Sequence, residues 1–320
     1  MNELFDTPLT SFEDKALESF AYQSENCLIY KQYLSHLNIK PSKINTVSQI
    51  PFLPIEFFKT HKVISGENEA SITFVSSGTT GQSLSKHYIT DIAAYENSFL
   101  KGFKHFFGKI EDYRILALLP SYLEREGSSL VYMCQQLINK SGDDSSGFYL
   151  DNYEELASLL SQQSTKKTML IGVSYALLDL AEQFPQPLEN TIVMETGGMK
   201  GKRPEKTKNE LHKILKHAFQ VDNIHSEYGM TELLSQAYSF SDGVFQTPRW
   251  MKVVIRDPQD PISLLAHHQV GGINVIDLAN INSCCFIATQ DLGKTINDTH
   301  FEVHGRLEAS DIRGCNLLVQ

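Results

Sequence analysis

Residues 76–81 read SSGTTG, and they directly follow an apolar, β-branched run at residues 72–75. A strand that ends in such small residues exposes consecutive backbone N–H groups and several hydroxyls, which together can cradle an anion. The Walker P-loop is excluded, because the run Gly293, Lys294, Thr295 lacks the Gly that would have to precede it. A polyphosphate-binding loop is the functional interpretation, and a linker of small residues is the alternative.

A second group of chemically active side chains, EYGMTE, occupies residues 227–232 after a short strand-like run. Tyr228 could stack on a base and Gly229 would let a ribose approach, while Thr231 could hold a phosphate oxygen and Glu232 could bind Mg²⁺. Those four tasks amount to nucleotide binding. In the structural alternative, Tyr228 is a core aromatic residue, and Thr231 and Glu232 are the N-cap and first-turn acid of a helix.

The elements that must position these motifs are predicted from periodicity. Between residues 71 and 228, short apolar runs alternate with helical patterns, which favours a parallel sheet covered by helices. Such sheets bind ligands beyond their strand carboxyl ends, so the SSGTTG loop and the TGGMKGKR loop at residues 196–203 are expected at one edge. Strands are predicted near residues 71–76, 113–119, 146–150, 167–173, 191–195 and 223–227, and helices near residues 91–107, 128–140, 152–163, 175–184 and 204–218.

The two ends of the chain have different patterns. Thr10 and Glu13 form a capping-box pair before an apolar pattern that predicts one or two helices over residues 12–37. Residues 50–58 are apolar but contain two Pro, so we expect an ordered, buried connector without regular structure.

After residue 238 helical periodicity gives way to β-patterned runs, which predict a β-rich subdomain. We therefore expect a division into residues 1–237, with the helical segment and the α/β nucleotide-binding part, and residues 238–320. The β-patterned runs lie at residues 252–255, 271–276, 285–289 and 301–304.

Composition narrows the function classes. The chain of 320 residues has 28 basic and 38 acidic side chains, a net charge of −10, and no Lys/Arg cluster that could follow a row of phosphates, which argues against a nucleic-acid partner. No apolar run approaches the roughly 18 residues of a membrane span, and the N-terminus lacks a signal-peptide pattern, so we expect a soluble, cytoplasmic protein. The sequence leaves the oligomeric state open.

Five scattered cysteines, without a CxxC pair or a matching His, disfavour disulfides and a zinc site. Four of them, Cys27, Cys134, Cys284 and Cys285, are expected to be ordinary buried thiols.

Five motifs follow one another in a defined order: SSGTTG, TGGMKG, EYGMTE, then TQDLG at residues 289–293 and GRLEASDIRG at residues 305–314. In this order they resemble the adenylate-forming superfamily of AMP-binding acyl-CoA synthetases, luciferases and nonribosomal adenylation domains. Within this superfamily, three further segments resemble the acyl-protein synthetase family of bacterial bioluminescence, the LuxE type. These segments are PFLPIEFFKTHKV, LPSYLEREGSSLVYM and the terminal RGCNLL.

The resemblance extends over essentially the whole chain. It implies an α/β fold, the large N-terminal domain of the adenylate-forming enzymes, with helix-covered, mostly parallel sheets and a β-rich C-terminal subdomain. It also implies that ATP and Mg²⁺ are the cofactors and that the first motif wraps the β- and γ-phosphates of ATP. The residues of that motif are Ser76, Ser77, Gly78, Thr79, Thr80 and Gly81.

The other motifs receive roles from the same resemblance. Tyr228 would stack on adenine, with Gly197 and Gly198 as the opposite wall. Thr231 would touch the α-phosphate and Glu232 would hold Mg²⁺.

The last two motifs would hold the sugar end of the nucleotide. Asp291 would accept both ribose hydroxyls, and Arg306 would brace the ribose or a phosphate.

One departure from the family pattern is large. Adenylate-forming enzymes usually continue past a GRxD hinge into a mobile lid domain that brings a lysine to the α-phosphate, whereas here Glu308 takes the hinge position and the sequence ends at Gln320. We therefore expect no lid domain, and either a substitute cation or a slower adenylation. Each candidate cation is also interpretable as a solvated loop charge. The candidates are Lys86, Lys200, Lys202 and Arg203.

The implied activity is that of an ATP-dependent acid–thiol ligase. A carboxylic acid, with a fatty acid as the expected class, would become acyl-AMP, and a thiol would then take the acyl group. In acyl-protein synthetases the acceptor is a Cys near the C-terminus, and Cys315 stands in the matching place, with Arg313 nearby to favour the thiolate. A small hydrophobic residue in a last strand is the alternative for Cys315.

The expected onward partner is an acyl-accepting protein or a reductase. Two other functions stay open: a coenzyme A ligase, and a non-catalytic subunit that binds acyl-adenylate.

Two further features have two interpretations each. His87, beside the phosphate loop, would neutralise a carboxylate or satisfy a backbone carbonyl. The aromatic residues Phe99, Phe103, Phe106 and Phe107 would line an acyl pocket or, as their helical spacing favours, belong to the core.

Overall fold

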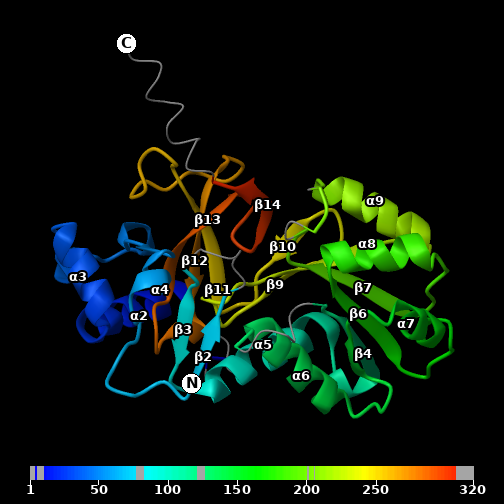
Figure 1. Ribbon diagram of the computed structural model, residues 1–320. Coiled ribbons are helices and arrows are strands. Elements are labelled where there is room, and N and C mark those ends of the chain that lie inside the picture. Colours follow the sequence, from blue (N-terminus) through cyan, green and yellow to red (C-terminus); the bar gives the residue numbers. More distant parts are fainter. Residues whose placement is uncertain are drawn as a thin grey trace. The chain divides into compact units, whose positions relative to one another are not determined.

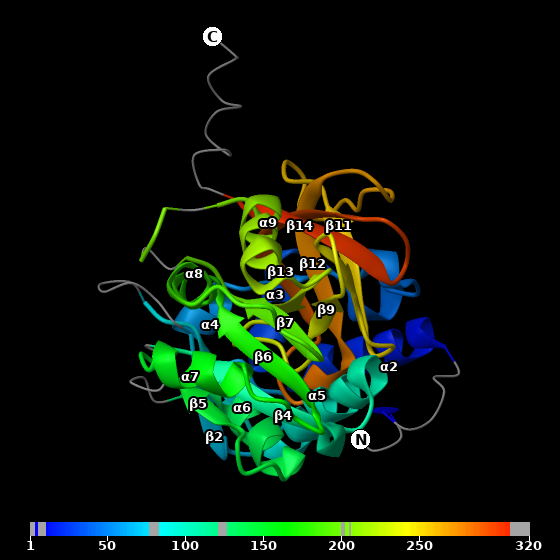
Figure 2. The same ribbon diagram turned by 90° about the vertical axis from the view of Figure 1, so that its right-hand side faces the viewer.

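Contacts between residues divide the chain into two compact units. Figures 1 and 2 show the chain from two sides, coloured along the sequence. The terminal unit comprises Met1–Ser98, Met230–Ser235 and Gln246–Gln320, and the central unit comprises Phe99–Gly229 and Gln236–Phe245. The predicted boundary after residue 237 stays a prediction. The computed structural model describes residues 4–5, 11–76, 83–120, 127–199, 202–204 and 206–307.

The central unit is built around a mostly parallel sheet with the strand order β9-β8-β7-β6-β4-β5, and β10 follows β9. Strands β8, β7, β6, β4 and β5 are parallel, and β9 is antiparallel to β8. Strands β4, β6 and β7 are buried along nearly their whole length, and each contains a run of at least three apolar residues, which is typical of parallel strands covered on both faces. The strands are β4 (Tyr113–Leu118), β5 (Gly147–Tyr149), β6 (Lys167–Val173), β7 (Thr191–Thr196), β8 (Ile224–Tyr228), β9 (Ala237–Ser239) and β10 (Val244–Gln246).

Helices cover this sheet, with α8 and α9 packed together on one face and α6 against β4 on the other (Figures 1 and 2). Thr207 and Glu210 form a capping box that starts α9. Helix α6 ends at Gly142, whose φ of 58° is the left-handed conformation that glycine adopts easily. The helices are α6 (Ser129–Ser141), α7 (Tyr153–Leu160), α8 (Ser174–Gln183), α9 (Lys208–Phe219) and the short η3 (Ile110–Asp112).

The terminal unit contains an antiparallel sheet in the order β11-β12-β13-β14, and β1 pairs with β13 in parallel. Strands β2 and β3 form a separate antiparallel hairpin. The strands are β1 (Leu53–Pro54), β2 (Ile72–Val75), β3 (Lys86–Ile89), β11 (Met251–Arg256), β12 (Gly271–Asp277), β13 (Phe286–Thr295) and β14 (His300–Arg306).

The first helices of the terminal unit pack on this sheet through an aromatic cluster. The rings of Phe20 and Tyr30 lie 6.1 and 6.2 Å from that of Phe286, between ring centroids. The helices and short turns are α2 (Phe12–Asn26), α3 (Leu28–His36), α4 (Phe57–Thr60), α5 (Ile92–Phe107, which continues into the central unit), η1 (Pro41–Lys43), η2 (Val47–Gln49) and η4 (Leu278–Asn280).

The predicted alternation of strands and helices and the later β-rich part are confirmed, and three local expectations are wrong. The strand that precedes the SSGTTG loop is not part of the parallel sheet, because β2 pairs with β3 in a separate antiparallel hairpin. The N-cap of α2 is Ser11 and not Thr10, because the Ser11 hydroxyl accepts the backbone N–H of Asp14. The segment at residues 50–58 contains β1 and the start of α4, which are too short to leave a periodic signal.

Two further findings concern the described residues only. Cys27, Cys134, Cys284 and Cys285 are buried and free, as predicted. Among the described helices, none combines the length and apolarity needed to cross a membrane.

Candidate functional site

The β2–β3 hairpin closes the base of the SSGTTG loop. The backbone N–H of Ser76 donates to the carbonyl oxygen of Ser85 at 3.0 Å, and the N–H of Ser85 donates to the Ser76 hydroxyl at 2.9 Å. The first residue of the loop is thus hydrogen-bonded to the residue that precedes β3. The rest of the predicted phosphate loop, Ser77, Gly78, Thr79, Thr80 and Gly81, lies outside the described residues.

Strands β7 and β8 bring the predicted adenine-binding residues to one edge of the central sheet. The two strands pair in parallel with Glu195 opposite Ser226, so both end at the same edge. Gly197 follows β7 with a φ of 68°, and a side chain on Gly198 would meet no atom within 4 Å. Tyr228, which ends β8, is 8% exposed, and its ring lies 5.7 Å from that of Phe245.

Glu227, just before Tyr228, was not singled out in the sequence. Its carboxylate accepts a hydrogen bond from the Thr196 hydroxyl at 2.5 Å. A Cβ on Gly229 would lie 2.3 Å from Oε1 of Glu227, so any other residue at that position would displace the end of the Glu227 side chain. Burial, together with the negative charge of Glu195, raises the pKa of Glu227 to about 7.

A buried ion-pair network lies next to this pair. Lys208 donates to the carboxylate of Glu195, and Nε2 of His212 lies 3.6 Å from the same oxygen atom. The Ser174 hydroxyl donates to the other oxygen at 3.2 Å. Burial works against ionisation of Glu195, but Lys208 and the hydrogen bonds outweigh it and hold the pKa at about 2. A charged Glu195 therefore lies near Glu227, which favours the neutral form of Glu227.

Residues 230–235 carry Thr231 and Glu232 into the terminal unit. Glu232 is 5% exposed, and its carboxylate is hydrogen-bonded to the side chain of Ser85. Burial raises the pKa of Glu232, while Ser85, Lys59 and Arg306 act in the opposite direction. The structure therefore connects the EYGMTE motif, through Glu232, to Ser85, which closes the base of the SSGTTG loop.

His87 satisfies a backbone carbonyl, which answers the question that the sequence left open. Its Nδ1 lies 2.8 Å from the carbonyl oxygen of Thr231, and its Nε2 lies 3.1 Å from Oδ1 of Asn280. Burial lowers the pKa of His87 to about 4, so the ring is neutral at pH 7 and has one N–H to donate. The Asn280 amide donates to the carbonyl oxygen of Glu232 at 2.8 Å.

Asp277 holds the C-terminal end of the segment at residues 230–235. Its carboxylate accepts hydrogen bonds from the backbone N–H groups of Leu234 and Ser235 at 2.8 and 3.0 Å, and from the Ser235 hydroxyl at 2.6 Å. Asp277 has no exposed surface. The sequence offered a backbone carbonyl as one possible partner of His87 but not which one. It missed Asn280 and Asp277 as supports, because the groups of residues 232–235 that they hold lie more than 40 residues away.

Asp291 and Arg306 lie opposite each other on β13 and β14. Nε of Arg306 is 3.6 Å from Oδ1 of Asp291, and the two side chains are 80% and 15% exposed, respectively. The backbone N–H of Asp291 donates to the Thr289 hydroxyl at 3.1 Å. Asp291, the predicted ribose ligand, and Arg306 are thus neighbours, and the arginine side chain extends into solvent.

The proposed substitute cations lie in different settings. Arg203 donates to Asp179 and to Glu182, so its charge is engaged by α8. Lys86 and Lys202 are exposed, and Lys200 lies outside the described residues. Lys59, which the sequence reasoning missed, acts on the carboxylate of Glu232 and is another cation of the terminal unit.

The donor set around Glu232 fits Mg²⁺ bound together with a nucleotide. Among the described residues, no group of three or more His, Cys, Asp or Glu side chains could hold a metal ion. Mg²⁺ usually needs no such cage, because one or two carboxylates suffice when phosphates and water complete its shell. Glu232 supplies one buried carboxylate of the required kind.

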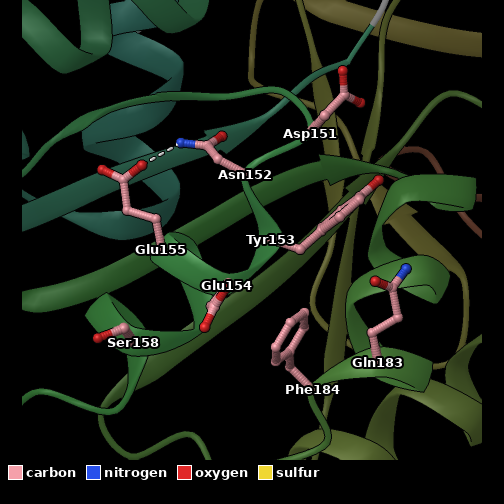
Figure 3. A pocket seen from close by; sticks show the side chains of 8 residues that line it. All are labelled: Asp151, Asn152, Tyr153, Glu154, Glu155, Ser158, Gln183 and Phe184. Atoms are coloured by element: carbon pink, nitrogen blue, oxygen red, sulfur yellow. Dashed lines mark hydrogen bonds between the residues drawn. The ribbon is translucent and has the colours of Figure 1, made fainter.

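An open hollow of about 640 Å³ lies elsewhere in the central unit, beside α7 and the end of α8 (Figure 3). Three of its lining side chains are the carboxylates of Asp151, Glu154 and Glu155. It contains none of the motif residues, and its negative charge would repel both ATP and a carboxylate. We therefore do not place the candidate site there.

The catalytic assignment of Cys315 and the hinge position Glu308 fall outside the described residues. The aromatic residues of α5 include core members: Phe99 and Phe103 are 1% and 2% exposed. Phe103 packs edge-on against Tyr113 with 5.3 Å between ring centroids, as the core interpretation requires.

A comparison with protein-family models found no match, and a comparison with curated proteins found none either. Solved structures do match. ATP-bound MatB from Rhodopseudomonas palustris has a TM-score of 0.55 at 15% identity, over 73% of this chain and 47% of MatB. The chain thus spans about half the length of the MatB structure.

A second solved structure covers more of the chain. 2-Hydroxyisobutyryl-CoA ligase in an open conformation, in complex with 2-HIB-AMP and CoA, has a TM-score of 0.70 at 13% identity, over 93% of this chain and 69% of that protein. The same ligase in its thioesterification state has a TM-score of 0.70 at 14% identity, over 96% and 71%. The chain therefore has the α/β fold of the large N-terminal domain of adenylate-forming ligases.

Proposed function

We propose that the chain is an ATP-dependent ligase that activates a carboxylic acid as acyl-AMP and transfers the acyl group to a protein thiol, its own Cys315. The observation that carries the proposal is the connection, through Ser85, between the first residue of one motif and a carboxylate of another in the terminal unit. Ser85, which closes the predicted phosphate loop through Ser76, also binds the buried carboxylate of Glu232. The predicted magnesium ligand would thereby lie beside the base of the predicted phosphate loop, an arrangement that would suit adenylation.

In the first step, an oxygen of the carboxylate attacks the α-phosphorus of ATP. The new bond joins that oxygen to phosphorus, the bond to the β-phosphate oxygen breaks, and pyrophosphate leaves. Glu232 would hold Mg²⁺, which when bound neutralises charge on the phosphate oxygens. Thr231 would donate its hydroxyl to the α-phosphate, and Asp291 would accept the ribose hydroxyls.

In the second step, a thiolate attacks the acyl carbonyl carbon, a thioester forms and AMP leaves. Cys315 is the proposed nucleophile, because it is the cysteine that the resemblance to acyl-protein synthetases identifies. The four described cysteines are buried, and burial raises the pKa of each, which disfavours the reactive thiolate. A partner reductase or acceptor protein would then receive the acyl group.

A second candidate function is an acyl-CoA ligase. It is favoured by the likeness to 2-hydroxyisobutyryl-CoA ligase, whose structure holds CoA. In that case the thiol of coenzyme A takes the place of Cys315, and the first step is unchanged. A binding subunit without turnover is the third candidate, and it would catalyse neither step.

Two assays test the proposal. Acid-dependent exchange of labelled pyrophosphate into ATP reports the first step, with fatty, aryl and short hydroxy acids as the panel. Intact mass after incubation with ATP, Mg²⁺ and the acid reports the second. We expect exchange, and a mass gain equal to one acyl group that Cys315→Ala abolishes and the matched variant Cys134→Ala retains.

The other outcomes discriminate between the candidates. Exchange together with an acyl-CoA product, and no mass gain on the protein, would replace the protein thiol by coenzyme A. A mass gain that persists in Cys315→Ala would move the acceptor to another residue. Absence of exchange with every acid, in protein that is shown to be folded, would leave only the binding subunit.

A further inference from the structure

One face of β3 is directed at the backbone of residues 231–232. Ser85 and His87 are buried while Lys86 between them is exposed, as expected where alternate side chains of an extended segment point to one side. Ser85 binds the carboxylate of Glu232, and His87 contacts the carbonyl oxygen of Thr231. The extended segment that leaves the SSGTTG loop therefore touches both side chain and backbone of the second motif.

Asn280 completes this arrangement from the η4 turn. It is 1% exposed, and its amide donates to the carbonyl oxygen of Glu232 at 2.8 Å. Its Oδ1 faces Nε2 of His87 at 3.1 Å, and its own carbonyl oxygen accepts a hydrogen bond from Gln23 at 3.1 Å. Two successive carbonyl groups, of Thr231 and Glu232, are thus held by two side chains that contact each other.

We propose that His87 and Asn280 are positioning residues that fix the peptide planes of Thr231 and Glu232, and so aim the Thr231 hydroxyl and the Glu232 carboxylate at the nucleotide. This inference rests on the proposed function. A backbone carbonyl held in one direction restricts the dihedral angles on either side of it, and with them the direction of the side chains. Neither His87 nor Asn280 needs to touch the nucleotide for this effect.

Both oxygens that face the ring can only accept, so the single N–H is assigned to the shorter contact, 2.8 Å between Nδ1 of His87 and the Thr231 oxygen. Nε2 then lies beside Oδ1 of Asn280 without a hydrogen bond. In His87→Asn, the side-chain amide can take the place of Nδ1 and keep this bond. In His87→Gln, the amide instead takes the place of Nε2, so the Thr231 carbonyl loses its donor. The two variants therefore separate loss of the ring from loss of the carbonyl contact.

The test measures binding of Mg-ATP by titration calorimetry and, separately, pyrophosphate exchange. Supporting groups one step removed from a ligand typically affect affinity by about tenfold or more, so we expect His87→Gln and Asn280→Ala to weaken Mg-ATP binding about tenfold. His87→Asn is expected to stay within about threefold of the unmodified protein. Because the two residues act as a unit, the double variant His87→Gln/Asn280→Ala should bind little more weakly than either single one.

Ser65→Ala is the matched control. Ser65 is also buried in the terminal unit, 3% exposed, and its hydroxyl donates to the carbonyl oxygen of Ser283 at 2.6 Å. Its removal should lower the melting temperature and leave Mg-ATP affinity unchanged.

Each remaining outcome overturns the inference. Equal affinity in His87→Gln and the unmodified protein would show that the contact positions nothing. Equal losses in His87→Asn, His87→Gln and Ser65→Ala would show a role in stability alone. If the unmodified protein bound no Mg-ATP, both the proposed function and this inference would fail. In the two preceding outcomes the unmodified protein does bind Mg-ATP, so only the inference fails.

Discussion

The stability of the Glu227→Gln variant, measured relative to the unmodified chain, should increase as the pH rises from 4.5 to 8. The carboxyl is held beside Thr196 and near the charged Glu195, and burial raises its pKa from 4.5 to about 7. Between pH 4.5 and about 7, the folded state therefore keeps the proton of Glu227, whereas the unfolded chain has lost it. The stabilising contribution of the group is present below pH 4.5 and is lost as the pH rises through 7.

The magnitude follows from the same values. A rise from 4.5 to about 7 corresponds to about 3 kcal/mol in the free energy of unfolding, at ~1.4 kcal/mol per pKa unit. Because solvent reaches part of the side chain, we expect about 2 kcal/mol. Glutamine keeps an oxygen that accepts from the Thr196 hydroxyl and removes the ionisation.

Urea unfolding followed by circular dichroism, at pH 4.5, 6 and 8, measures the effect. The stability of Glu227→Gln minus that of the unmodified chain should increase by about 2 kcal/mol over this range. The same substitution at the exposed Glu25 controls for the loss of a negative charge. A difference that stays constant with pH would refute the reasoning, since it would mean that Glu227 ionises alike in the folded and unfolded states.

Two other substitutions have defined outcomes. Ser11→Ala should cost about 1 kcal/mol of stability in urea unfolding through loss of the α2 cap, whereas Thr10→Ala should change little; equal costs would place the cap elsewhere. Asp291→Asn should weaken Mg-ATP binding by about tenfold in calorimetry, because a hydrogen bond to a charged acceptor becomes one to a neutral acceptor; unchanged affinity would contradict the ribose role.

Periodicity predicted the central sheet well, because its strands are buried apolar runs separated by helices with clear apolar faces. The predicted strand at residues 167–173 is β6 (Lys167–Val173), and the predicted helix at residues 91–107 is α5 (Ile92–Phe107). Four short strands, β1, β3, β9 and β10, were missed. Sequences such as KHYI in β3 and AYS in β9 are too short and too polar to show alternation.

The motif residues could be found in the sequence, whereas their supports could not. Small residues, an aromatic ring and a carboxylate at close spacing are a local signal. The partners of His87 lie 144 and 193 residues away, and the groups of residues 234–235 that Asp277 holds lie more than 40 residues away. Only the folded chain brings such groups together, so pairings of this kind leave no local pattern.

The N-cap of α2 is another feature that the sequence alone does not decide. Thr10 and Ser11 are adjacent, and either hydroxyl can cap a helix, so the sequence does not choose between them. The structure decides through the Ser11 contact with the backbone N–H of Asp14.

Transfer of an oxygen atom from the acid to AMP tests the central claim most directly. The protein would be incubated with ATP, Mg²⁺ and carboxylic acids labelled with ¹⁸O in the carboxylate, and the nucleotides and phosphates analysed by mass spectrometry. We predict that acid-dependent turnover produces AMP carrying one ¹⁸O atom, because the acid oxygen that attacks the α-phosphorus stays on it. Unlabelled AMP, or label in inorganic phosphate with ADP as the nucleotide product, would contradict adenylation.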